Sequence, residues 1–182
     1  MDDHLKETLI SGEVVYEGSF LKVRRDSVRL PDGSETAREY FRHPGAVVII
    51  PLLDDGRVLL ERQYRYPNDR VFIELPAGKL EYGEDPLLCA QRELREETGY
   101  SASDWRFVCT IHNAIAYSDE HLDIFLARGL VSGEQQLDPG EFLELISVSP
   151  EELMTWVRQG QITDVKTLIG AFWLEKILRG EW

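Results

Sequence analysis

The feature that most constrains this 182-residue chain is a glycine-rich loop followed directly by an acidic helix, together covering residues 78–100. Asp85 suits the N-cap of that helix and Pro86 its first position. Gly99 suits the left-handed position just after its end. These signals predict a helix over 86–98, entered through a tight loop.

Three carboxylates share one face of the predicted helix. Glu93, Glu96 and Glu97 fall at i, i+3 and i+4, a spacing at which side chains are neighbours. Like charges repel there, whereas a set of oxygen ligands suits a hard divalent cation such as Mg²⁺ or Mn²⁺, which also binds phosphates. The alternative is a solvated acidic face paired with Arg92 and Arg95. The glycine-rich loop before the helix favours the metal interpretation.

The rest of the chain predicts an α/β fold. Residues 46–53 form a continuous apolar run, typical of a strand that is buried on both faces. A turn over 54–56 predicts a hairpin in which 57–64 pairs with that strand. The second half predicts two strands and then two helices. The further segments are an extended region over 12–43, strands over 71–75, 105–111 and 122–127, a helix between Ser149 and Gly160, and a helix over 164–179.

Charge and composition exclude several classes of function. The chain has 33 acidic and 20 basic residues, for a net charge of −13, so neither a nucleic-acid nor a membrane partner is expected. Its longest apolar run is far shorter than the ~20 residues of a membrane helix. The N-terminal residues have no basic start and no apolar stretch, so no secretory signal is expected. Cys89 and Cys109 have no metal or redox spacing, which predicts reduced thiols and a cytoplasmic location.

The loop and helix together resemble the Nudix hydrolase family. Its box reads glycine, five residues, glutamate, seven residues, and then Arg-Glu-apolar-any-Glu-Glu-any-Gly. The chain matches the box at Gly78, Glu84, Arg92, Glu93, Leu94, Glu96, Glu97 and Gly99. The resemblance implies a Nudix α/β/α sandwich with a mixed β-sheet over 44–182. It also implies a small N-terminal β subdomain over 1–43 that serves dimerisation.

The resemblance also implies roles for residues of the box. The expected metal ligands are Glu93 and Glu97, assisted by Glu96, and the backbone carbonyl of Ala77. Arg92 and Glu84 are expected to orient the site and not to bind the ion directly. The expected cofactor is Mg²⁺ or Mn²⁺, because divalent ions neutralise a pyrophosphate and activate water. Glu93 and Glu97 would thereby be catalytic.

Features outside the box resemble the branch that hydrolyses ADP-ribose and nucleoside diphosphate sugars. They are the β-rich N-terminal segment and the stretches 61–66 and 71–78. By this resemblance the substrate-binding residues are Arg38 and Arg65 at the phosphates, Glu74 beside substrate or metal, and Phe20 stacked on the base. A loop over 137–144 resembles a mobile loop with a catalytic glutamate, at Glu141 or alternatively at Glu144.

The expected function is Mg²⁺-dependent hydrolysis of the diphosphate bond of a nucleoside diphosphate sugar by a cytoplasmic homodimer. ADP-ribose, cut to AMP and ribose 5-phosphate, is the favoured substrate. The alternatives are hydrolysis of GDP-mannose or another nucleotide sugar, and a non-catalytic ligand sensor with the same fold. An intact box favours the enzyme over the sensor.

Overall fold

The computed structural model describes residues 2–182, which form two compact units. The first unit contains the residues up to Pro44 together with His112–Glu120, and the second contains Gly45–Ile111 and His121–Trp182. The sequence-based boundary at 43/44 stays a prediction, and the first segment of the first unit ends at Pro44. Sequence reasoning did not place His112–Glu120 with that segment.

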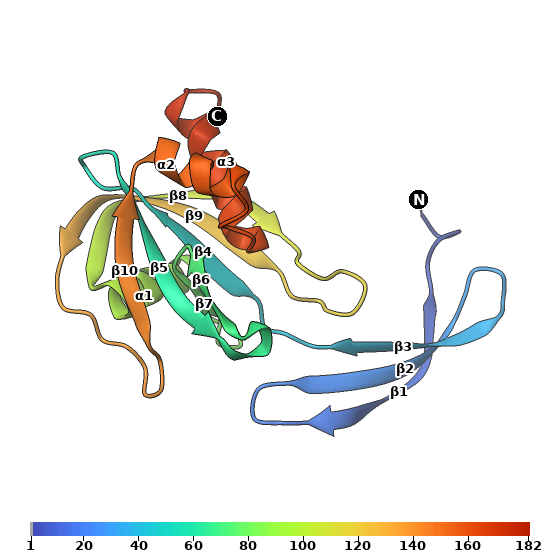
Figure 1. Cartoon of the computed structure of the whole chain (residues 1–182). Helices are drawn as coiled ribbons and strands as arrows, with labels where there is room; N and C mark the ends of the chain where they lie inside the picture. The colour runs from blue at the N-terminus through green and yellow to red at the C-terminus, as the bar shows by residue number, and fades with distance from the viewer. Residues whose placement is uncertain (1) are drawn as a thin grey trace. The chain divides into compact units, whose positions relative to one another are not determined.

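The first unit is an antiparallel sheet of three strands in the order β1-β2-β3 (Figure 1). The strands are β1 (Thr8–Glu17), β2 (Lys22–Arg29) and β3 (Glu35–Phe41). The distant segment joins β3 because the Phe41 N–H donates to the Tyr117 carbonyl at 3.1 Å. The Asp119 carboxylate accepts from the His43 N–H at 2.8 Å. Backbone hydrogen bonding therefore ties a late loop to the N-terminal unit.

The second unit contains two sheets. One is antiparallel, in the order β10-β5-β6, and the other is mixed, in the order β7-β4-β9-β8, with β4 and β9 parallel. The strands are β4 (Ala46–Pro51), β5 (Val58–Arg65), β6 (Arg70–Glu74), β7 (Ala77–Lys79), β8 (Tyr100–Ile111), β9 (Leu122–Ser132) and β10 (Leu143–Val148), with a 3₁₀ turn at Tyr66–Asn68.

Three helices cover the sheets of the second unit: α1 (Pro86–Thr98), α2 (Pro150–Arg158) and α3 (Val165–Leu178). Helix α1 has the predicted bounds, and its Asp85 cap accepts from two backbone N–H groups. Figure 1 shows α1 on the opposite side of the sheets from α2 and α3. The predicted α/β/α sandwich with a small N-terminal β unit is confirmed. Among residues 2–182, no helix has the length and apolar character needed to cross a bilayer.

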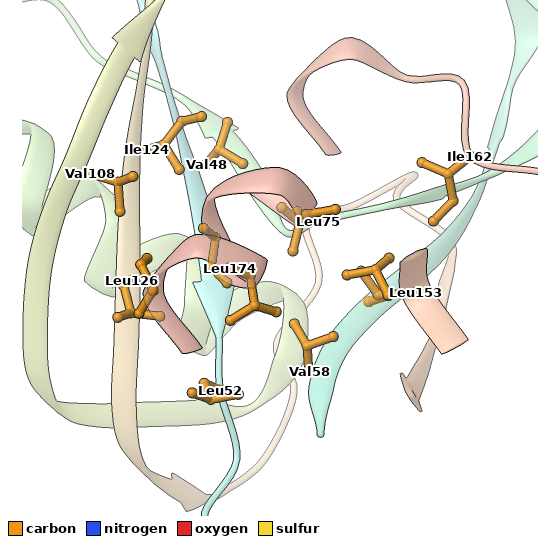
Figure 2. Close-up of a cluster of buried hydrophobic side chains, with 14 of the residues drawn as sticks. Val48, Leu52, Val58, Leu75, Val108, Ile124, Leu126, Leu153, Ile162 and Leu174 are labelled. Carbon is orange, nitrogen blue, oxygen red and sulfur yellow. The ribbon is translucent and has the colours of Figure 1, made fainter. Parts of the chain in front are cut away.

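Strand β4 separates two apolar cores. All six of its residues are buried, which confirms the prediction made for its apolar run. Val48 and Ile50 belong to the larger core, which α2 and α3 cover (Figure 2). Val47 and Ile49 face the smaller core, which α1 covers. Alternate side chains of a strand point to opposite faces, so one apolar run serves both cores.

The expected hairpin between 46–53 and 57–64 is wrong. The turn itself forms, because the Gly56 N–H donates to the Leu53 carbonyl at 2.9 Å. Apart from one isolated bridge, however, β4 and β5 enter different sheets. Both edges of β4 are occupied by β7 and β9, and those of β5 by β6 and β10. The partners of β4 and β5 are therefore set by competition from distant strands and not by the turn between them.

The second half has three strands where two were expected. The additional strand is β10, and it includes Leu143 and Glu144, which were assigned to a loop. It pairs with β5 in register Leu143↔Gln63 through Val148↔Val58. Strand β8 also begins earlier than predicted, at Tyr100. A six-residue strand gains its hydrogen bonds from its partner, so local sequence specifies it weakly.

Helix α3 offers a matched test of the core. Leu174 is 1% exposed and belongs to the larger core, whereas Leu178, one turn later, is 48% exposed. We expect Leu174→Ala to lower the free energy of unfolding by about 2–5 kcal/mol because it leaves a cavity. Leu178→Ala should cost less than about 1 kcal/mol. Urea denaturation measures both, and equal losses would contradict this packing.

Candidate active site

Strand β7 brings the glycine-rich loop against helix α1. Its pairing with β4 sets Gly78 opposite Val47. A Cβ atom on Gly78 would lie 1.8 Å from Cδ of Glu93. No other residue fits without moving that carboxylate or the strand. The glycine is therefore required because the Glu93 side chain lies directly against the backbone.

The Arg92 guanidinium holds the acidic face of α1 in place. Its Nη1 donates to Glu93 Oε1 at 2.7 Å and to Glu96 Oε2 at 3.0 Å. Its Nε donates to Glu84 Oε1 at 3.2 Å. Burial opposes the charge on Arg92, but these carboxylates outweigh it and raise the pKa of the guanidinium. Glu84 also accepts from the Glu81 N–H at 2.9 Å, so the arginine ties the loop to the helix.

Glu97 is the most deeply buried carboxylate of the helix face, at 5% exposed. Its Oε2 accepts from the Ala77 N–H at 3.0 Å, which places the backbone of Ala77 beside it. Burial raises the pKa of Glu97 to about 10. The negative charges of Glu61, Glu93 and Glu141 act in the same direction. Four carboxyl groups thus lie close enough to influence one another.

Glu61 is a member of this group that sequence reasoning missed. It lies on β5 directly opposite Glu74 and is only 3% exposed. Burial raises its pKa to about 8, followed by the charges of Glu141 and Glu74. Its Oε1 atom is buried without a hydrogen-bond partner. The sequence signal that could have found it is a glutamate directly after the apolar run Val58-Leu59-Leu60.

Arg65 and Glu74, both expected at the substrate, form a bidentate pair. Arg65 Nε and Nη2 donate to the two carboxylate oxygens at 2.7 and 2.8 Å. Lys166, which sequence reasoning missed, also donates to Glu74 and to Asp164. Burial favours the neutral acid, but Arg65 and Lys166 outweigh it and lower the pKa of Glu74. These groups line an open pocket together with Phe72.

The loop before β10 brings Glu141, and not Glu144, to the carboxylates. Its start is fixed to the end of α1, since Gln135 Nε2 donates to the Glu97 carbonyl at 2.5 Å. Burial raises the pKa of Glu93 and Arg92 opposes this effect, while the charges of Glu96 and Glu141 raise the pKa further. Glu144 is exposed in β10 and accepts from Arg62 at 2.5 Å.

Arg38 and Phe20 belong to the first compact unit, whereas the carboxylates belong to the second. Arg38 is on β3 and donates to Glu7 at 2.6 and 3.0 Å. Phe20 is 62% exposed and lies 6.0 Å from the His43 ring, measured between centroids. Arg38 is thus a side chain of the N-terminal sheet, and Phe20 lies in the connection between β1 and β2.

The chemistry of the donor set fits a hard divalent cation. Within residues 2–182, no group of three or more His, Cys, Asp or Glu side chains is arranged to hold a metal ion. One reason is that Glu93 and Glu96 are ion-paired with Arg92. Even so, the buried groups are carboxylates of like charge, and one buried oxygen lacks a donor. Oxygen donors and excess negative charge are what Mg²⁺ and Mn²⁺ require.

Two family profiles match the chain. One is described as a NUDIX domain and matches residues 42–167. The other is described as a nucleoside diphosphate sugar hydrolase N-terminal domain and matches residues 7–41. Together they cover residues 7–167, which include the N-terminal sheet and most of the second unit.

Curated relatives and a solved structure agree with these profiles. The ADP-ribose pyrophosphatase of Bacillus subtilis is 35% identical over 173 residues, 94% of each chain. The methanol dehydrogenase activator of Bacillus methanolicus is 36% identical over 172 residues, 93% of each chain. The ADP-ribose pyrophosphatase of Mycobacterium tuberculosis is 44% identical over 131 residues, which are 71% of this chain and 63% of that protein. A crystal structure of an ADP compounds hydrolase has the same fold, with a TM-score of 0.88 at 23% identity over 97% of this chain and 96% of that one.

The buried carboxyl groups predict an unusual pH dependence of stability in the metal-free protein. The folded-state pKa values of Glu61 and Glu97, about 8 and about 10, lie above the ordinary value of 4.5. Their contribution to stability is therefore full below the unfolded value and is lost as the pH rises through the folded values. We expect the free energy of unfolding in EDTA to fall between about pH 4.5 and about pH 10, the range bounded by the unfolded and folded pKa values.

Urea denaturation across that range measures the effect. Glu97→Gln should flatten the profile, since it removes one of the two groups. Added Mg²⁺ should also flatten it, because a cation offsets the charge that appears at high pH. A stability that rises with pH in EDTA would contradict the burial described for these groups.

Proposed function

The chain belongs to the Nudix family, and we propose that it hydrolyses the diphosphate bond of nucleoside diphosphate sugars, with ADP-ribose, cut to AMP and ribose 5-phosphate, as favoured substrate. It is a pyrophosphatase. The observation that carries the proposal is the group of buried carboxylates on α1, set against Gly78 and Ala77. The relatives named ADP-ribose pyrophosphatase support the choice of substrate.

We propose Glu93, Glu97, Glu96 and the backbone carbonyl of Ala77 as the groups that hold the cation, Mg²⁺ or Mn²⁺. Glu93 and Glu96 accept hydrogen bonds from Arg92, and these would be exchanged for ligand bonds when a cation binds. When bound, such an ion neutralises the pyrophosphate charge and polarises an attacking water. Arg92 remains bonded to Glu84 and keeps the helix face oriented.

The chain's own cations would position the substrate phosphates. Arg65 donates to Glu74 through Nε and Nη2, which fixes the guanidinium plane and leaves Nη1 on the side away from that carboxylate. A fixed guanidinium binds phosphate with little further loss of conformational freedom. Arg38 would contact the phosphates and Phe20 would stack on the base, both from the N-terminal unit.

Glu141 is proposed as the general base. It follows a Pro-Gly turn, and its N–H donates to the Asp138 carbonyl at 3.0 Å. A carboxylate on a loop beside the metal ligands can accept a proton from the attacking water and release it when the loop opens. Glu144 is a poorer candidate because it is an exposed residue of β10 that is paired with Arg62.

A homodimer is proposed from the surface of the first unit. Every residue of β1 is exposed, and five of them are large and apolar. They are Leu9, Ile10, Val14, Val15 and Tyr16, which are 43–59% exposed. A three-stranded sheet with so much apolar surface gains stability by packing against a second copy. The match to an N-terminal domain of nucleoside diphosphate sugar hydrolases covers this same sheet.

A cytoplasmic location is proposed from the state of the cysteines. Cys89 and Cys109 are both free thiols. Burial raises the pKa of Cys89 to about 12, so it stays a protonated and unreactive thiol. Free cysteines are typical of a reducing compartment. The net charge of −13 is unfavourable for binding nucleic acids, because they are themselves negatively charged.

A substrate panel tests the activity. ADP-ribose, GDP-mannose, UDP-glucose and a dinucleoside polyphosphate are compared by kcat/KM with Mg²⁺ and with Mn²⁺. The proposal expects the highest value for ADP-ribose and none in EDTA. A preference for GDP-mannose would shift the substrate but keep the reaction. No hydrolysis of any compound with either metal would favour a ligand sensor.

The choice between the two loop glutamates is tested by a matched pair of substitutions. For Glu141→Gln we expect kcat to fall by about 10²–10⁴-fold, the usual contribution of a general base. Substrate Kd, measured by calorimetry with Ca²⁺, should change by less than about tenfold, since the phosphate contacts remain. Glu144→Gln should retain nearly full kcat. A dead Glu144→Gln beside an active Glu141→Gln would reverse the assignment.

The dimer is tested by its mass. Light scattering at micromolar concentration should give twice the 20.9 kDa of one chain. Val14→Glu or Leu9→Glu should lower that mass, because each puts a charge on the exposed apolar face of β1. A monomer mass that persists as an active preparation is concentrated would overturn the dimer.

A further inference from the structure

Glu61 has a buried carboxyl oxygen without a hydrogen-bond partner. It is 3% exposed, and its Oε1 atom accepts no hydrogen bond. Among residues 2–182, only Arg128 Nε shares the condition of a buried and unpartnered side-chain polar atom. Leaving a buried polar oxygen unsatisfied in this way is costly, and a bound cation would remove that cost.

The neighbouring carboxylates are already engaged by groups of the protein. Glu93 accepts from Arg92, and Glu97 accepts from the Ala77 N–H. Glu74, opposite Glu61 on β6, accepts from Arg65 and Lys166. Oε1 of Glu61 differs from these carboxylate oxygens because no N–H or O–H group of residues 2–182 donates a hydrogen bond to it.

The charges around Glu61 are mostly negative. Glu141 and Glu74 both disfavour its ionised form, whereas a hydrogen bond with the Glu97 side chain acts weakly in the opposite direction. Lys166 acts in the opposite direction, but its ammonium is hydrogen-bonded to Glu74 and Asp164. The side chain thus points into a region of negative charge where a cation would relieve the repulsion.

We propose that Glu61 is an additional carboxylate ligand for the divalent cation held by Glu93 and Glu97, contributed by β5 from across the site. This inference rests on the proposed function, since it concerns the same metal. It adds a ligand from outside the glycine loop and helix α1. A cation held between β5 and α1 would fix the distance between two elements that belong to different layers of the fold.

A purely structural role for Glu61 makes a different prediction. In that case its protonated carboxyl group would hydrogen-bond to Glu97 and no metal contact would exist. Glutamine can make the same hydrogen bond, so Glu61→Gln would leave metal binding unchanged. Loss of a ligand, by contrast, lowers affinity for the metal alone, without any substrate.

The test is calorimetric titration of the substrate-free protein with Mn²⁺. We expect Glu61→Gln to raise the Mn²⁺ Kd by at least about tenfold relative to the wild type. The control is Glu151→Gln, on the exposed first turn of α2, which should bind Mn²⁺ as the wild type does. A melting curve in EDTA establishes that each variant is folded. Glu61→Asp keeps the charge on a shorter side chain and should also weaken binding, so it replaces the glutamine variant if that one does not fold.

The outcomes separate this inference from the function on which it rests. If the wild type binds Mn²⁺ and hydrolyses ADP-ribose while the folded Glu61 variant binds Mn²⁺ with unchanged Kd, Glu61 is not a ligand and only this inference is overturned. If the wild type hydrolyses none of the nucleotide sugars, the proposed function itself fails. A weakened Mn²⁺ Kd in the Glu61 variant but not in the Glu151 control supports the additional ligand.

Discussion

The burial of β4 on both faces is the constraint on which the other features of the second unit depend. Because its alternate side chains enter two cores, helices must cover both sides of the sheet. The edges of β4 are filled by β7 and β9, so the glycine-rich loop is held as the outer strand β7. That pairing sets Gly78 against Glu93 and the Ala77 N–H against Glu97.

The second consequence is a concentration of negative charge inside the fold. Helix α1 turns its acidic face toward β5 and the loop, where burial and like charges raise the pKa of Glu97 and Glu61. Arg92 offsets part of this charge from the helix side, and Arg65 with Lys166 offset that of Glu74. Acidic groups are therefore held close together where a divalent cation and a pyrophosphate would bind. Such fixed charges are typical of catalysis by a preorganised site.

Much of the site could be predicted because it depends on local spacing. The i, i+3, i+4 positions of Glu93, Glu96 and Glu97 fix a shared face on any helix. Proline and glycine signals gave the bounds of α1 because they act on the backbone directly. Pairing between strands that are far apart in the chain was harder to predict from the sequence. The hairpin expected from the turn at 54–56 was wrong because distant strands outcompeted it, and β10 was missed because β5 supplies its hydrogen bonds.

The sequence by itself therefore determined the helix, its acidic face, the α/β class and the family resemblance, all of which follow from short-range periodicity and spacing. Only the tertiary structure decided which carboxylates meet. It placed Glu61 and Glu141 beside the box, joined Lys166 to Glu74, and set Glu144 outward on Arg62. The reason is physical: burial and like-charge coupling depend on distances between residues far apart in the chain, and those distances are set by strand pairing.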